Sequence, residues 1–92
     1  MALRSLGEGG RPVALCLLLI SETAPDERYV GVTSDLKARL AEHNAGRSRH
    51  TSKFKPWRVE TYVAFSERSK AEAFERYLKS GSGHAFAKRR LW

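Results

Sequence analysis

The chain has 92 residues, with 17 Lys and Arg against 10 Asp and Glu and a net charge of +7 at pH 7. This length accommodates one domain with a single small core, and the positive charge favours a polyanionic partner, most often nucleic acid. Cys16 is the single cysteine, which excludes an internal disulfide and a Cys-rich zinc site. Because it lies in an apolar run, we expect a buried, unreactive thiol.

The N-terminal part of the chain contains a glycine-rich segment and then an apolar run. Residues 1–11 have no apolar period, which predicts a flexible tail followed by one domain over 12–92. The run at 13–20 is too short to cross a bilayer as a helix. With Glu8 and Glu22 on either side it is also a poor signal peptide. We therefore predict a buried central strand, a cytoplasmic protein and no membrane association.

The next elements are a hairpin and an amphipathic helix. Residues 21–28 carry the turn residues Pro25 and Asp26, and 28–32 form a second strand that should pair antiparallel with the first. A helix should start at a cap on Thr33 or Ser34 and end near Gly46 in a left-handed conformation.

That helix places polar residues in an apolar stripe. On a wheel of about 100° per residue, Arg39 and His43 share one side with Leu36 and Leu40. The pattern otherwise predicts apolar residues at such positions, so the two polar side chains are candidates for chemistry.

The second half of the chain has a basic loop, a strand and two helices. Residues 46–57 form the loop, and 57–65 alternate as a third strand that should place Trp57, Val59, Thr61, Val63 and Phe65 on one face. Ser69 and Glu72 fit a capping box for a helix that Gly81 and Gly83 should end, and 84–91 form a short basic helix. The expected fold class is α/β (α+β), a small three-stranded antiparallel sheet flanked by helices.

An ordered set of motifs resembles the GIY-YIG endonucleases, specifically their small single-domain bacterial members. Tyr29-Val30-Gly31 is similar to the second half of the family signature, and Arg39 and His43 match its helix arginine and its histidine or tyrosine. The segments that start at His43 and at Phe74 resemble the short members, and the metal-binding glutamate maps onto Glu75. The resemblance covers about 13–91.

One expected residue is missing from this pattern. The resemblance places a tyrosine on the first strand, where this chain has Leu17 or Leu18, and no tyrosine precedes Tyr29. In the family, that tyrosine lines the active site and helps to hold the nucleophile.

The resemblance implies a metal-dependent DNA endonuclease that hydrolyses a phosphodiester by in-line attack of water and leaves a 5′ phosphate, in a setting such as DNA repair or recombination. Glu75 would hold one Mg²⁺ or Mn²⁺, and no small-molecule cofactor is expected. Arg39 would grip the scissile phosphate, Tyr29 would position or deprotonate the water, and His43 would orient the Tyr29 hydroxyl or share in proton transfer.

The basic loop is the candidate nucleic-acid interface. With Phe54 and Trp57 interleaved as stacking platforms, its cations suit a surface that follows a DNA backbone. The candidate DNA-binding residues are Lys37, Arg47, Arg49, His50, Lys53 and Lys55. Two alternatives remain open, a DNA-binding module with impaired cleavage and a basic interaction domain with an acidic protein partner.

Overall fold

A computed structural model describes residues 14–92, so the tail predicted over 1–11 lies outside the described part. Its elements are three strands, β1 (Ala14–Ser21), β2 (Arg28–Thr33) and β3 (Trp57–Phe65), the helices α2 (Leu36–Asn44), α3 (Arg68–Leu78) and α4 (Gly81–Arg90), and the short 3₁₀ helix η2 (Ser52–Phe54). The predicted α+β fold is confirmed: the strands form one antiparallel sheet in the order β2-β1-β3.

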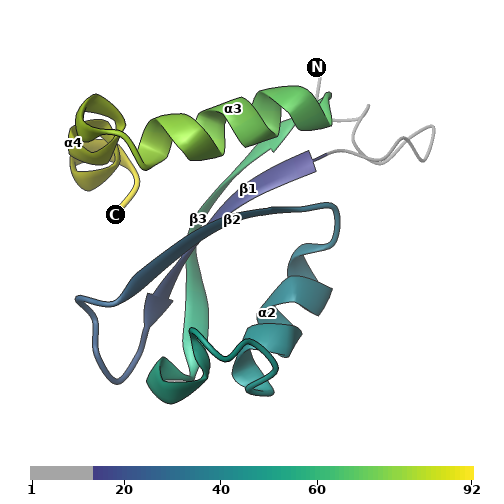
Figure 1. The fold of residues 1–92 in the computed structure, drawn as a ribbon, viewed down its shortest axis with the longest axis vertical. Helices are drawn as coiled ribbons and strands as arrows, with labels where there is room; N and C mark the ends of the chain where they lie inside the picture. The colour runs from purple at the N-terminus through teal and green to yellow at the C-terminus, as the bar shows by residue number, and fades with distance from the viewer. Residues whose placement is uncertain (1–13) are drawn as a thin grey trace.

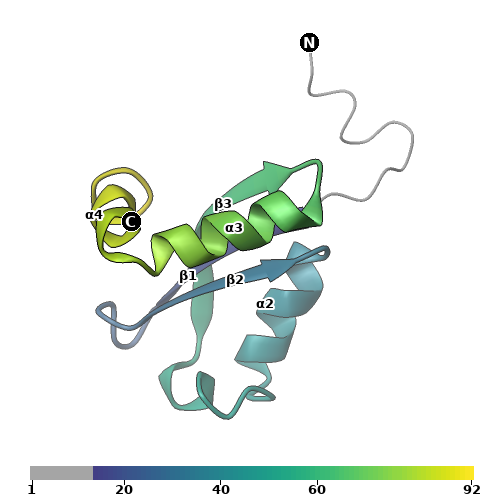
Figure 2. The ribbon, with the colours of Figure 1, turned by 45° about the horizontal axis from the view of Figure 1, so that its top comes forward.

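Helices cover both faces of the sheet, with α3 and α4 on one side and α2 on the other (Figures 1 and 2). β1 lies in the middle and is buried along almost its whole length, as its apolar run predicts. Its side chains alternate between the two faces. Cys16 and Leu18 pack with Leu78 of α3, whereas Leu17 and Leu19 pack on the side of α2. None of the helices in residues 14–92 is long and apolar enough to span a membrane.

The predicted single face of β3 is wrong, because an irregularity interrupts the strand. Leu18 pairs with Thr61 while Leu19 pairs with Val59, so Glu60 is an extra residue at this point. An extra residue moves the side chains after it to the opposite face. Val59 therefore packs on the α2 side, whereas Phe65 packs on the α3 side.

The predicted start of α2 is also displaced. Asp35, not Thr33 or Ser34, is the N-cap, and its carboxylate accepts a hydrogen bond from the Ala38 amide at 3.0 Å. Thr33 instead closes a turn, in which its hydroxyl accepts from the Asp35 amide at 3.0 Å. Asp and Thr are both good caps, and the side-chain turn at Thr33 decides between them.

The end of α2 is as predicted. Gly46 has a φ of 78°. Its amide donates to the His43 carbonyl and the Arg47 amide donates to the Glu42 carbonyl, each at 3.2 Å. These two hydrogen bonds form a Schellman motif, which turns the chain sharply into the basic loop.

The predicted boundaries of α3 and α4 need correction. α3 begins at Arg68 after Glu67, without a side-chain cap, so the capping box of Ser69 and Glu72 does not form. The glycines expected to end α3 lie inside α4, which Ser80 caps by accepting from the Gly83 amide.

Gly83 allows α4 to pack tightly against the end of α3. A Cβ at Gly83 would lie 1.6 Å from the Tyr77 carbonyl oxygen. No other residue fits this position without moving the backbone, so this glycine serves helix packing and not helix termination.

Candidate active site

Tyr29 and Gly31 lie two residues apart on β2 and therefore share the face covered by α2. The Tyr29 ring folds over Gly31: a Cβ at Gly31 would be 2.7 Å from the phenol oxygen and 2.8 Å from Cε2. The absence of a side chain at Gly31 thus makes room for the ring and sets the direction of its hydroxyl.

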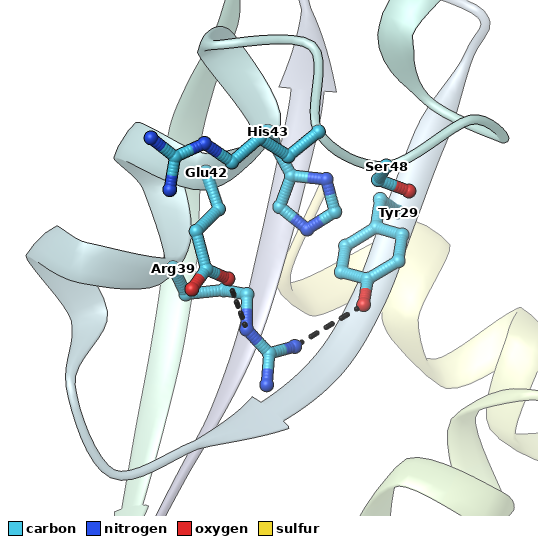
Figure 3. Close-up of a pocket in the computed structure, with 6 residues that line it drawn as sticks. Tyr29, Arg39, Glu42, His43 and Ser48 are labelled. Atoms are coloured by element: carbon cyan, nitrogen blue, oxygen red, sulfur yellow. Dashed lines mark hydrogen bonds and ion pairs between the residues drawn. The ribbon is translucent and has the colours of Figure 1, made fainter.

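Arg39 of α2 reaches this hydroxyl. Its Nη1 donates to the Tyr29 oxygen at 3.3 Å (Figure 3). Its Nη2 donates to the Val32 carbonyl at 3.1 Å. Glu42 lies one turn further along the helix, with an oxygen 3.6 Å from Nε. Each terminal nitrogen of a guanidinium carries two N–H groups, so one donor on each stays available for a ligand.

His43 is buried beneath the same ring. It is 3% exposed, and its ring centroid lies 4.3 Å from that of Tyr29. Nδ1 hydrogen-bonds the Thr51 hydroxyl at 2.7 Å, whereas Nε2 is buried without a partner in the described chain. Burial, reinforced by the nearby Arg39 charge, lowers the pKa of His43 below its ordinary value of 6.5, so the imidazole is neutral at pH 7.

The geometry of His43 differs from its predicted role in one respect. The Tyr29 hydroxyl is held by Arg39, while His43 contacts the face of the phenol ring. The imidazole therefore positions the ring by packing and does not hydrogen-bond the hydroxyl.

Thr51 is a residue whose structural role the sequence analysis missed. It is 2% exposed and joins α2 to the basic loop, since its hydroxyl contacts His43 and its carbonyl accepts from the Trp57 indole at 2.9 Å. Asn44 adds a second clamp, donating to the Trp57 carbonyl at 3.0 Å and accepting from the Trp57 amide. The sequence signal that could have found Thr51 is His43 in the apolar stripe of its helix, because a buried imidazole needs a polar partner.

These side chains surround an open cleft of about 230 Å³, lined by Tyr29, Arg39, Glu42, His43, Arg47 and Ser48. Two arginines face one carboxylate, so the cleft carries a positive excess that suits a phosphate. Glu42 and Ser48 were not among the expected site residues. The sequence does contain a signal for Glu42: it follows Arg39 by three residues, a spacing at which two helical side chains can form an ion pair.

Glu75 does not line this cleft. It lies on α3, which packs on the opposite face of the sheet, and its Oε2 accepts from Lys79 at 3.1 Å. Its side chain is 26% exposed and so remains within reach of solvent. Residues 14–92 hold no group of three or more His, Cys, Asp or Glu placed to bind a metal.

A single carboxylate such as Glu75 can still be a ligand of Mg²⁺. Mg²⁺ keeps several waters and often takes only one or two protein carboxylates, with substrate phosphate oxygens as further ligands. Glu75 fits an ion completed by substrate and does not fit a preformed metal centre, and its Oε1, which does not pair with Lys79, is the oxygen that would bind the ion.

The predicted DNA-binding residues are solvent-exposed: Lys37 lies in the first turn of α2, and the others lie in the loop that follows the helix. Arg47 lines the cleft itself, and Lys37 lies on the outward side of α2. The exposed set is Lys37, Arg47, Arg49, His50, Lys53 and Lys55. The stacking role expected for Trp57 is wrong, because its side chain is 3% exposed and packs in the core with Leu17 and Leu19.

The structure also shows which leucine faces the candidate site. Leu17 pairs with Gly31, packs on the α2 side with Tyr29 and is fully buried, whereas Leu18 faces α3. An apolar side chain at Leu17 offers no hydroxyl to this site. Cys16, as expected, is buried, and burial raises the pKa of its thiol to about 11.

Comparisons with known proteins agree with the resemblance. Residues 16–89 match the model of the GIY-YIG catalytic domain. The chain is 36% identical over 73 residues to a protein named structure-specific endonuclease subunit SLX1 homolog from Giardia intestinalis, and this match covers 75% of the chain but only 20% of that protein.

Two bacterial proteins named only as UPF0213 proteins are also similar. The one from Cupriavidus pinatubonensis is 37% identical, over 75% of this chain and 81% of its own length. The one from Lacticaseibacillus paracasei is 37% identical, over 61% of this chain and 64% of its own. No solved structure shows significant similarity. Because the family model spans most of its length, the chain belongs to the GIY-YIG catalytic domain family.

Proposed function

We propose that this protein is a metal-dependent DNA endonuclease that hydrolyses one phosphodiester bond by in-line attack of water. The observation that carries the proposal is the Arg39 guanidinium, anchored to Tyr29 and Val32 at the edge of a positively charged cleft. Family membership and the printed name of the Giardia relative support nuclease chemistry.

Arg39 is the residue that would stabilise the transition state. Charge builds on the non-bridging phosphate oxygens during attack, and a planar guanidinium can donate to two of them at once. Two hydrogen bonds to the protein hold the guanidinium in place before substrate arrives. This preorganisation avoids the cost of ordering a long side chain at the moment of reaction.

Tyr29 would position the attacking water. Its oxygen already accepts from Arg39, so its own proton is free to point towards the cleft and to donate to a water there. An ordinary phenol is a poor base at neutral pH, so the role proposed for Tyr29 is to orient the water.

His43 would act on Tyr29 through packing, and its Nε2 is the atom that would share in proton transfer. If Nδ1–H donates to Thr51, Nε2 presents a lone pair, and its neutral state at pH 7 allows it to accept a proton. Thr51 is thus a positioning residue, because its hydroxyl fixes the orientation of the ring.

Glu75 is the proposed ligand of Mg²⁺ or Mn²⁺. When bound, the ion supplies positive charge to the phosphate and to the leaving oxygen. The carboxylate oxygens are the hard ligands that such ions prefer, and the remaining ligands must come from water and substrate.

The exposed cations of α2 and the basic loop would hold the DNA backbone, with affinity that falls as salt rises and little sequence information. Selectivity for a branched or otherwise structured DNA in repair or recombination is part of the proposal, and the name of the Giardia relative supports it. A protein partner that directs the nuclease is compatible with this proposal. The proposed location is the cytoplasm.

A second function is favoured by one observation. The resemblance places a tyrosine at Leu17 or Leu18, and Leu17 is the one of the two that faces Gly31 and the candidate site. Loss of that hydroxyl suits a DNA-binding module of the same fold with impaired cleavage.

Cleavage assays on branched, nicked and duplex DNA in Mg²⁺ and in Mn²⁺ distinguish these functions. Arg39→Ala and Glu75→Ala should each abolish cleavage while DNA affinity stays within about tenfold, because both groups act on the transition state more than on bound substrate. Glu72→Ala is the matched control, since Glu72 forms the same kind of pair with Arg68 on α3, at 3.0 Å.

Each candidate function predicts a different result in these assays. Salt-sensitive DNA binding without cleavage in either metal establishes the binding module. Absence of salt-sensitive binding to any DNA favours the basic domain with an acidic protein partner. Cleavage that survives both Arg39→Ala and Glu75→Ala refutes the proposed site.

A further inference from the structure

A second cleft lies on the other side of β2 from the candidate active site. It has a volume of about 280 Å³ and a floor of Val30, Leu78 and Ala87, where β2, α3 and α4 meet. Its rim carries the basic side chains of Arg28, Lys79 and His84, together with the Trp92 ring. None of the residues that line it is acidic.

Arg28 is held in a conformation suited to ligand binding. Its guanidinium carbon lies 4.9 Å from the centroid of the Trp92 ring, a cation–π arrangement. A guanidinium that stacks on an indole keeps its N–H groups in the exposed plane, where they can donate to a phosphate. Trp92 itself is anchored, since it packs against the core cluster of Cys16, Leu18 and Leu78.

Lys79 connects this cleft to the proposed metal ligand. Its ammonium pairs with Glu75, yet its side chain is 58% exposed and lines the cleft beside His84. The pair uses only Oε2 of Glu75, so the other carboxylate oxygen would be available to a metal ion while Lys79 stays at the cleft.

The two clefts flank the same strand. Arg28 and Tyr29 are consecutive on β2, so their side chains point to opposite faces of the sheet. β2 is an edge strand, and a polyanion can pass around it from the Tyr29 side to the Arg28 side. Proteins hold a nucleic-acid strand with a positively charged groove and aromatic side chains, and this cleft combines basic side chains with the Trp92 ring.

We propose that this second cleft binds the nucleic-acid strand next to the scissile phosphate, with a flanking phosphate on Arg28 and the adjoining sugar or base on the apolar floor. This inference rests on the proposed function, because it extends the substrate beyond the cleft of Arg39. It assigns substrate binding to a surface outside the basic loop.

The test measures DNA binding without metal, so that it does not depend on cleavage. Fluorescence anisotropy of a labelled branched DNA is followed as salt is raised. Arg28→Gln should weaken binding about tenfold and reduce the salt slope by about one, as loss of one phosphate contact does. Lys70→Gln is the control: Lys70 is exposed and, nine positions from Lys79, lies on the opposite side of α3 at about 100° per residue.

Trp92 reports whether DNA occupies the cleft. Trp57 is 3% exposed and shielded from aqueous quenchers, so acrylamide quenching reports chiefly on Trp92. DNA should protect Trp92 from acrylamide in the wild type and in Lys70→Gln, and less so in Arg28→Gln at the same saturation.

Several results overturn the inference. The inference is wrong if DNA binding by Arg28→Gln and by Lys70→Gln has the same salt slope. It is also wrong if DNA does not change the acrylamide quenching of Trp92. Protection of Trp92 by polyglutamate at the same charge concentration would identify an acidic peptide as the occupant instead. Weaker DNA binding by Arg28→Gln supports DNA binding in the second cleft even if the wild type does not cut DNA. Failure of the proposed function has a different sign, which is absence of cleavage in the assays that contain metal.

Discussion

The Gly31→Ala variant tests whether the position of the Tyr29 ring matters for catalysis. The added Cβ would lie 2.7 Å from the Tyr29 oxygen, 2.8 Å from Cε2 and 3.0 Å from Cζ. Favourable contacts between non-bonded carbon atoms are about 3.5–4.0 Å, so the ring must move outward by about 1 Å. Such a displacement would break the Arg39 contact, which is already 3.3 Å long.

The expected loss is in kcat and not in folding. Misplacement of a catalytic group by about 1 Å costs roughly 10²-fold in rate. Overpacking costs about 1–3 kcal/mol, but the Tyr29 ring faces an open cleft and can swing into it. Replacing Gly with Ala in a strand also returns about 0.5–1 kcal/mol. We therefore expect a change in unfolding free energy of no more than about 1 kcal/mol.

The assay pairs single-turnover cleavage with urea denaturation. Gly81→Ala is the matched control, because nothing lies within 4 Å of a Cβ at Gly81. In NMR spectra, the contacts between the Tyr29 and His43 rings, now 4.3 Å apart, should weaken in Gly31→Ala only. A Gly31→Ala protein that cleaves as fast as the wild type would refute the placement of Tyr29 in the reaction.

Two further predictions concern stability. Because the folded-state pKa of His43 is below 6.5, the unfolded chain takes up its proton more readily. The contribution of His43 to the unfolding free energy should thus be fully present above pH 6.5 and be lost as pH drops through its folded-state pKa. In urea titrations between pH 5 and 8, the His43→Asn variant should show a flatter pH dependence than the wild type. Gly83→Ala places a Cβ 1.6 Å from the Tyr77 carbonyl oxygen, so it should cost about 3 kcal/mol and lower the urea midpoint, whereas Gly81→Ala should not.

Local patterns were sufficient to predict most of the fold. The apolar run became the central strand β1, and Arg39 and His43 do share a helix side with Leu36 and Leu40, which pack against the sheet. These predictions succeed because periodicity and helix ends depend on neighbouring residues. Gly46 belongs to this class, since its positive φ is needed by the adjacent helix end alone.

The wrong predictions involve partners that are distant in sequence. The irregularity at Glu60 depends on how β3 pairs with β1, and alternation within β3 cannot reveal it. Trp57 resembles a surface aromatic next to basic residues, yet the Thr51 carbonyl and the Leu17 and Leu19 side chains bury it. In the sequence, Gly83 resembles a residue that ends a helix. The reason for a glycine here is the close Tyr77 carbonyl of α3, and this contact exists only when α3 and α4 pack together.

The position of β2 at the edge of the sheet determines how the candidate groups can act together. Arg39 approaches from the α2 face and Glu75 from the α3 face, and the buried side chains of β1 separate the two faces everywhere else. One phosphate can meet both groups only at the outer edge of β2, where a strand leaves backbone groups unpaired. Arg39 already binds the Val32 carbonyl, which would otherwise repel an approaching phosphate. Under the proposed function a substrate strand would therefore run around this edge, and Arg28 lies on that path beyond Tyr29.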